Sequence, residues 1–269
     1  MSIKNRSILL WIFSFIFMVG IAMYQRTTGP TYPVRGKTEV NGQNIKYSLI
    51  RTWGGAGDAK VEVNIADTSV KGSYMFKRYK SDDEWTTAAM LREGDKLIAL
   101  LPHQAPAGKI AYHVTLISKG QEFKLNEKPA VLRYKGDVPA YIMIPHIIFI
   151  FLAMVFSVRA AVEAYFKGPD TYKIALWCVL SFALSGMILG PIVQKFAFDA
   201  YWTGWPFGHD LTDNKTLFAF IAWVVAVIRL RKNPANRGWA FAAAIIMLAV
   251  YLIPHSMFGS EIVYTTAKP

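Results

Sequence analysis

Five apolar runs constrain the fold of this sequence more than any other feature. They occupy residues 8–24, 138–158, 174–193, 217–228 and 238–253, and charged residues flank them rather than interrupt them. A helix of about 20 apolar residues crosses the hydrocarbon core of a bilayer, so runs of this kind are typical of transmembrane helices. A hydrophobic content of 53% and a mean hydropathy of +0.26 also place the chain in the membrane class.

The basic residues between these runs predict how the chain is threaded. Cytoplasmic loops carry an excess of lysine and arginine, and this bias sets the orientation. We assign these basic residues to the cytoplasm: Lys4, Arg6, Arg159, Lys167, Lys173, Arg229, Arg231, Lys232 and Arg237. The result is a bacterial inner-membrane protein with five transmembrane helices, a cytoplasmic N-terminus and an extracytoplasmic C-terminus. The same rule explains much of the net charge of +12, so no nucleic-acid partner is expected.

The first run has two interpretations, a cleaved signal peptide and a retained signal-anchor helix. The apolar region of a signal peptide is about 7–15 residues long and ends at small residues. Here the run ends in the bulky Met23 and Tyr24. We therefore favour a signal-anchor over residues 1–25, which leads the chain out of the cytoplasm.

Residues 26–137 have a different pattern, made of short alternating segments. Asn41-Gly42 separates two such segments and is a hairpin signal, because both residues tolerate positive φ. Val61, Val63 and Ile65 alternate with polar residues, as a half-buried strand requires. Seven to nine strands of this kind predict an extracytoplasmic β-sandwich, similar in pattern to immunoglobulin-like or fibronectin type III-like modules. No signature motif supports a family name.

Residues 138–255 are expected to form a four-helix transmembrane domain, followed by an extracytoplasmic tail over 256–269. An aromatic loop within 194–215, broken by glycine and proline, is expected on the outer membrane surface. Asp213 is predicted to be the N-cap of the helix that follows this loop. That helix spans the bilayer only if Lys215 reaches up to the interface.

Several chemistries are excluded by what the sequence lacks. Cys178 is the only cysteine, so no internal disulfide, thiolate zinc cluster or covalently attached c-type haem is expected. The phosphate-binding, dinucleotide-binding, zinc-protease and nucleophile-elbow motifs are absent as well. No catalytic residue is therefore assigned.

The remaining chemical signal is a group of imidazoles and carboxylates on the predicted outer face. The tripeptide Ile-Pro-His ends at His146 and again at His255. The candidate metal ligands are His146, His209, His255, Asp210 and Glu261. Imidazole and carboxylate suit zinc, copper or iron, and a b-type haem between His146 and His255, or contact with a quinone, is the weaker alternative. A structural role for the histidines is the third interpretation.

Two functional hypotheses follow from these observations. The first is a metal- or redox-linked membrane protein that acts at the outer membrane–water interface on a lipid-soluble or membrane-proximal substrate, with the aromatic loop walling its site. The second is a non-catalytic accessory or assembly subunit, in which the β-sandwich docks an exported partner and the helices dock a membrane complex.

Overall fold

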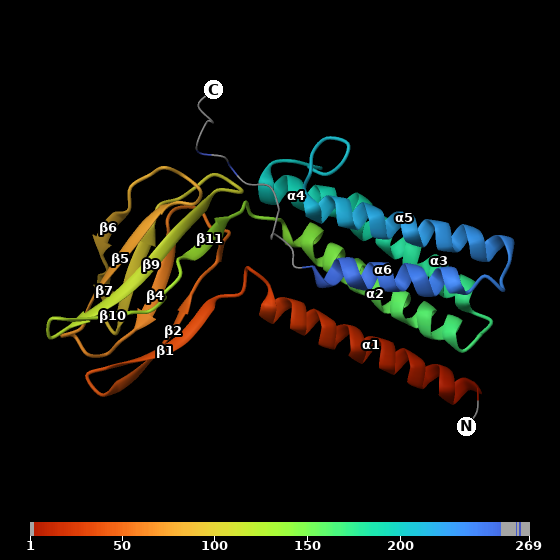
Figure 1. Ribbon diagram of the computed structural model, residues 1–269, viewed down its shortest axis with the longest axis horizontal. Helices are drawn as coiled ribbons and strands as arrows, with labels where there is room; N and C mark the ends of the chain where they lie inside the picture. The colour runs from red at the N-terminus through yellow and green to blue at the C-terminus, as the bar shows by residue number, and fades with distance from the viewer. Residues whose placement is uncertain (1–2, 254–261, 263, 265–269) are drawn as a thin grey trace. The chain divides into compact units, whose positions relative to one another are not determined.

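The computed structural model describes residues 3–253, Ile262 and Tyr264, and shows an α+β protein. The chain forms two compact units (Figure 1). The helical unit comprises residues 1–29 and 138–259, and the β unit comprises residues 30–137 and 260–269. The β unit is therefore inserted into the helical unit after its first helix.

The helical unit contains helices joined by short connections. In chain order they are α1 (Ile3–Thr28), α2 (Ala140–Tyr165), α3 (Thr171–Phe182), the π-helix η1 (Ala183–Leu189), α4 (Gly190–Phe198), α5 (Leu211–Lys232) and α6 (Gly238–Leu252). Helices α3, η1 and α4 follow one another without a break, so they form one continuous helical segment. Helices α5 and α6 run side by side, as Figure 1 shows.

Four helical segments among the described residues are long and apolar enough to cross a membrane. These segments are Asn5–Thr28, Ala140–Tyr165, Thr171–Phe198 and Leu211–Lys232, whereas the apolar helix α6 is shorter, with 15 residues. Their outward faces are apolar, since Ile12 is 49% exposed and Ile16 is 64% exposed on α1. A membrane protein with a β domain accounts for this combination of elements.

Small residues allow the helices to pack closely. Ala153 on α2, Ala219 on α5 and Ala240 on α6 are fully buried in the core of the helical unit, where they surround larger side chains such as Trp223. Lipid supplies no hydrophobic driving force between helices, so close backbone approach and packing must stabilise such a bundle.

Helix α2 extends further than the sequence predicted. The predicted span ended at Val158, but the helix continues to Tyr165. The extension is stabilised by a buried ion pair, in which Arg159 Nη1 donates to Glu163 Oε2 at 2.7 Å. The guanidinium of Arg159 also lies over the ring of Trp11, at 5.3 Å from its centroid. The segment expected to begin a cytoplasmic loop is thus part of the packed helix.

The β unit is built of short strands. In chain order they are β1 (Val34–Val40), β2 (Gln43–Leu49), β3 (Thr52–Trp53), β4 (Ala59–Asn64), β5 (Lys71–Arg78), β6 (Thr86–Ala89), β7 (Leu91–Glu93), β8 (Lys96–Leu101), β9 (Lys109–Ser118), β10 (Gln121–Lys124) and β11 (Ala130–Tyr134). The predicted hairpin at Asn41-Gly42 joins β1 to β2, and both turn residues have positive φ, 51° and 76°. This expectation is confirmed.

The strands form sheets that enclose one apolar core. A six-stranded sheet has the order β3-β11-β9-β5-β6, with β10 also paired to β9. A three-stranded sheet, β4-β8-β7, and the hairpin β1-β2 complete the unit. All pairings are antiparallel except that of β3 with β11. Strand β4 alternates buried and exposed residues along its whole length, so every second side chain enters the core, as expected for a β-sandwich.

A residue from beyond the last helix belongs to the β unit. The hydroxyl of Tyr264 donates to Gln104 Oε1 at 3.2 Å. The guanidinium of Arg78 lies over the ring of Tyr264, at 4.7 Å from its centroid. The chain on both sides of the segment α2 to α6 is therefore attached to the same β unit.

Candidate functional site

A cavity of about 280 Å³ lies within the helical unit, between α1, α2, α3, α5 and α6. Its lining residues are Gln25, His146, Ile150, Met154, Phe182, Lys215, Thr216, Ala219, Met247, Val250 and Tyr251. We refer to it as the His146 cavity. Its polar side chains come from four different helices, and polar groups inside a membrane-spanning bundle are costly and commonly mark a functional site.

His146 is held in one orientation by a backbone carbonyl. Its Nδ1 lies 3.1 Å from the carbonyl oxygen of Ser185 in η1. A carbonyl can only accept, so Nδ1 carries a proton and donates. Within the described residues Nε2 has no hydrogen-bond partner, and in the neutral ring it is the atom available to a ligand.

The π-helix explains why the Ser185 carbonyl is placed to accept this bond. Pro191 lacks the N–H group that a regular α-helix would donate back to Met187. The widened turn directs the N–H of Gly190 to the carbonyl of Ser185 instead. Glycine also suits position 190, because a Cβ built there would lie only 3.2 Å from the carbonyl oxygen of Ser185. Single π-turns of this kind are frequent at functional sites.

Lys215 places a cationic side chain on the wall of the same cavity. The residue is only 7% exposed, and its Nζ donates to the carbonyl of Ile253 at 2.6 Å. That Lys215 also lies near the membrane interface, as the sequence predicts, stays a prediction. Its ammonium is turned towards the end of α6. There it donates a hydrogen bond to a carbonyl oxygen that has no partner within the helix.

Two further side chains complete the polar part of the wall. Gln25 Nε2 donates to the carbonyl of Tyr251 at 2.7 Å and so ties α1 to α6. Thr216 Oγ1 donates to the carbonyl of Thr212 at 2.8 Å, which leaves its lone pairs able to accept from a ligand. The ends of α1 and α6 and the beginnings of α2 and α5 thus gather polar groups at one end of the bundle.

The aromatic loop is fixed to α5 by a buried carboxylate. Asp213 is 6% exposed, and its Oδ2 accepts from the backbone nitrogens of Thr203 at 2.6 Å and Gly204 at 3.0 Å. Gln194 Nε2 donates to the same oxygen at 3.2 Å. A Cβ at Gly204 would lie 2.6 Å from the Cβ of Asp213, so this close approach requires glycine.

The predicted N-cap of α5 is therefore wrong. The cap is Asp210, whose side chain accepts from the backbone nitrogen of Thr212 at 2.7 Å. Asp213 lies one turn further along and serves the loop instead. Both residues are aspartates at the start of an apolar run, and local sequence does not distinguish the two roles.

The loop presents large aromatic side chains outward. Tyr201 is 60% exposed, Trp205 is 68% exposed and Phe207 is 83% exposed. No described residue of the segment 199–210 lines the His146 cavity. The expectation that the aromatic loop walls the site thus does not apply to this cavity, and the exposed rings suit a membrane–water interface instead.

The predicted metal ligands are placed as follows. His146 lines the cavity, whereas His209 is an exposed loop residue and Asp210 is the helix cap, and neither of these two lines the cavity. His255 and Glu261 lie outside the described residues. Among the residues that the structure describes, no group of three or more His, Cys, Asp or Glu side chains could hold a metal ion.

The cavity suits a ligand that accepts hydrogen bonds. Lys215 has donors beyond the one that it gives to Ile253, whereas Thr216 Oγ1, which already donates to Thr212, and the unprotonated Nε2 of His146 can accept. The rest of the wall is apolar, as in most small-molecule sites. Sequence reasoning found His146 but missed Lys215 and Gln25; the available signal was a charged or amide side chain close to the end of an apolar helix.

No protein-family model matches the chain, and no curated protein matches it.

Proposed function

We propose that this chain is an integral membrane protein that binds a membrane-soluble molecule through a polar head in the His146 cavity. The observation that carries the proposal is the buried cation of Lys215 on the wall of a largely apolar cavity that it shares with His146. A buried ammonium is expensive unless it serves structure or binding.

The charge of the wall favours a particular head chemistry. Acidic oxygens or carbonyl oxygens would accept from the ammonium of Lys215. A metal cation is disfavoured by the same ammonium, because like charges repel strongly where water is scarce. The competing proposal is the transition-metal site predicted from the sequence, with the ligands His146, His209, His255, Asp210 and Glu261.

We further propose five spans in a bacterial inner membrane, with the N-terminus in the cytoplasm. Because Tyr264 and the strands share one unit, the chain must cross the membrane an even number of times between Asp137 and Ser260. Helix α6 then crosses as well, although its 15 residues measure only about 22 Å. Local thinning of the bilayer accommodates such a helix.

The positive-inside rule supports this orientation. Arg229, Arg231 and Lys232 lie in the last turn of α5, at the end opposite Lys215. Membrane-impermeant maleimide should label Phe207→Cys in intact cells, and Ala235→Cys only after permeabilisation, each in a Cys178→Ser background. Labelling of both positions in intact cells would contradict the proposed orientation.

For the β unit we propose an immunoglobulin-like or fibronectin type III-like sandwich. Its support is the set of antiparallel strands around one core, described above. An exported domain of this kind could also dock a partner, as an accessory subunit would require. Stable co-purification of a fixed protein partner without a bound small molecule would favour that second function.

The test of the binding proposal is to identify what the protein retains from its own membrane. The full chain is purified in mild detergent, extracted with organic solvent and analysed by mass spectrometry. We expect one acidic or carbonyl-bearing amphiphile enriched over bulk lipid, and a loss of about tenfold in His146→Ala and in Lys215→Met. The control is Lys195→Met, which removes an exposed lysine that is paired with Asp199. Equal enrichment in all variants would overturn the proposal.

A further inference from the structure

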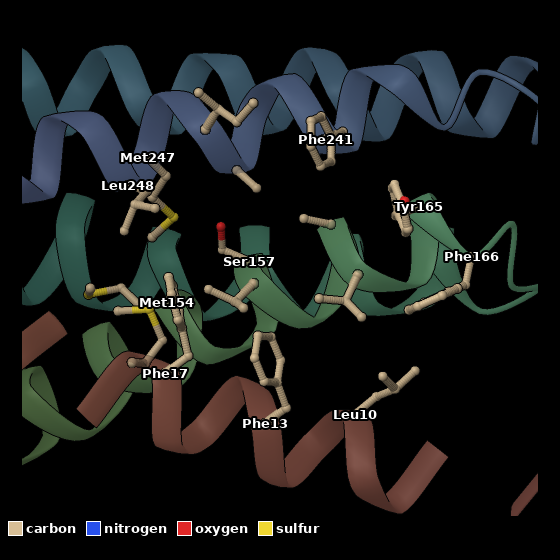
Figure 2. Close-up of a pocket in the computed structure, with 16 residues that line it drawn as sticks. Leu10, Phe13, Phe17, Met154, Ser157, Tyr165, Phe166, Phe241, Met247 and Leu248 are labelled. Carbon is tan, nitrogen blue, oxygen red and sulfur yellow. The ribbon is translucent and has the colours of Figure 1, made fainter. Parts of the chain in front are cut away.

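A second, larger hollow lies between α1, α2 and α6. Its volume is about 530 Å³, and its wall is almost entirely apolar. We call it the apolar groove. In Figure 2 its lining side chains extend from Met154 and Met247 at one end to Tyr165 and Phe166 at the other. Such a large apolar hollow inside a membrane-spanning unit is filled by hydrocarbon.

The apolar groove and the His146 cavity adjoin each other at a pair of methionines. Met154 on α2 and Met247 on α6 line both hollows. Methionine is unbranched and flexible, so it fills an irregular gap and can move aside for a ligand. A molecule whose head occupies the His146 cavity would therefore have its tail directed between these two side chains.

The length of the combined site limits what can fill it. At 1.5 Å per residue, His146 and Phe166 lie about 30 Å apart along α2. This distance equals the full hydrocarbon thickness of a bilayer, about 30 Å, whereas the acyl chain of one leaflet covers about half of it. A tail that fills the groove from a head at His146 is longer than an ordinary acyl chain.

We propose that the ligand is a long-tailed amphiphile of the prenyl type, with its head in the His146 cavity and its tail in the apolar groove. This inference rests on the proposed function and names the substrate class of the same site. The head is a phosphate or a quinone, which share the acceptor oxygens that the ammonium of Lys215 requires.

The test follows the tail by crosslinking. The full chain is reconstituted in vesicles of phosphatidylethanolamine and phosphatidylglycerol with a long-chain prenyl phosphate that carries a diazirine at its tail end. We expect the label on peptides that contain Ala161, Tyr165 or Phe241, which line the groove. Unlabelled long-chain prenyl phosphate and long-chain prenyl quinone are then added as competitors, and the stronger competitor identifies the head.

Two plug variants make the test specific. Ala161→Trp fills the groove and should reduce groove labelling about tenfold. Ile221→Trp is the control, because Ile221 lies on the outward face of α5, is 50% exposed and lines neither hollow. Equal labelling in Ala161→Trp, or a label spread over the outward faces of all helices, would overturn the inference.

The head variants separate the two proposals. If Lys215→Met abolishes labelling but the label in the unsubstituted protein lies outside the groove, the proposed function stands and the tail assignment fails. If Lys215→Met and His146→Ala both leave groove labelling unchanged, the head assignment fails, and the head-and-tail ligand fails with it.

Discussion

Asp213 accepts a hydrogen bond from the backbone nitrogen of Thr203 through its Oδ2 atom, at 2.6 Å. This contact joins the first turn of α5 to a loop that presents three exposed aromatic rings. The carboxylate accepts from two successive backbone nitrogens of the loop, which fixes the path of the loop. The loop is thus an ordered platform at the same end of the bundle as Lys215, rather than a loose connection.

Substitution of Asp213 by alanine should release this loop. The nitrogens of Thr203 and Gly204 would lose their acceptor, and an unsatisfied buried donor costs roughly 1–3 kcal/mol. We expect the free energy of unfolding in detergent to fall by about 2–3 kcal/mol, with faster proteolysis within the loop. Asp199→Ala is the control, because the side chain of Asp199 is 82% exposed. Similar stability in both variants would show that Asp213 does not hold the loop in place.

The buried pair of Arg159 and Glu163 should stabilise the opposite end of the bundle. Glu163→Ala leaves a buried guanidinium uncompensated, which costs about 3–5 kcal/mol. The matched control is Asp170→Ala, since Asp170 forms an exposed pair with Lys173 at 3.3 Å. That variant should lose about 0.5 kcal/mol or less. Thermal unfolding in detergent measures both, and equal losses would refute the assignment.

The β unit contains an ion pair whose contribution depends on pH. Hydrogen bonds from the Arg78 guanidinium lower the pKa of Asp83 to about 2. A carboxyl whose pKa is lower in the folded state contributes stability above its unfolded pKa of about 4, and loses it as the pH falls towards 2. Asp83→Asn should therefore reduce the melting temperature at about pH 7, and the deficit should shrink as the pH approaches 2.

The control for this pH dependence is the neighbouring exposed acid, Asp82. Asp82→Asn removes the same formal charge without removing the partner of Arg78. Melting curves of the full chain across the acidic range should separate the two variants. If the deficit of Asp83→Asn did not change with pH, the ion pair would not be its cause.

Metal content distinguishes the two occupants considered for the His146 site. With Lys215 on the wall, we expect any zinc, copper or iron in the purified protein to be independent of His146. Elemental analysis of the unsubstituted protein, His146→Ala and His255→Ala measures this. Stoichiometric metal that is lost in both variants would instead establish the metal centre predicted from the sequence.

The elements of the fold followed from local patterns. Apolar runs located the helices, and alternation with turn residues located most strands, because both signals depend on neighbouring residues alone. The helix from Leu211 to Lys232 extends well beyond its apolar run at 217–228. This extra length is what a helix with so short an apolar run needs to cross the bilayer. The very short strand β3, over Thr52 and Trp53, was not predicted, since two residues carry no periodicity.

The site was only partly predictable. His146 could be found because a proline-histidine pair inside an apolar run is unusual. The burial of Lys215 could not, because it depends on which carbonyl α6 brings alongside α5. The exchanged roles of Asp210 and Asp213 have the same origin, since the path of the loop decides which carboxylate it meets.

If the His146 cavity binds the head of one membrane-derived molecule, that molecule should remain bound to the intact chain. Native mass spectrometry of the intact chain, released from mild detergent, measures this directly. We predict one adduct of defined mass on the unsubstituted protein and on Lys195→Met, and its loss in Lys215→Met. A protein without any adduct, or an adduct that persists in both Lys215→Met and His146→Ala, would contradict the claim.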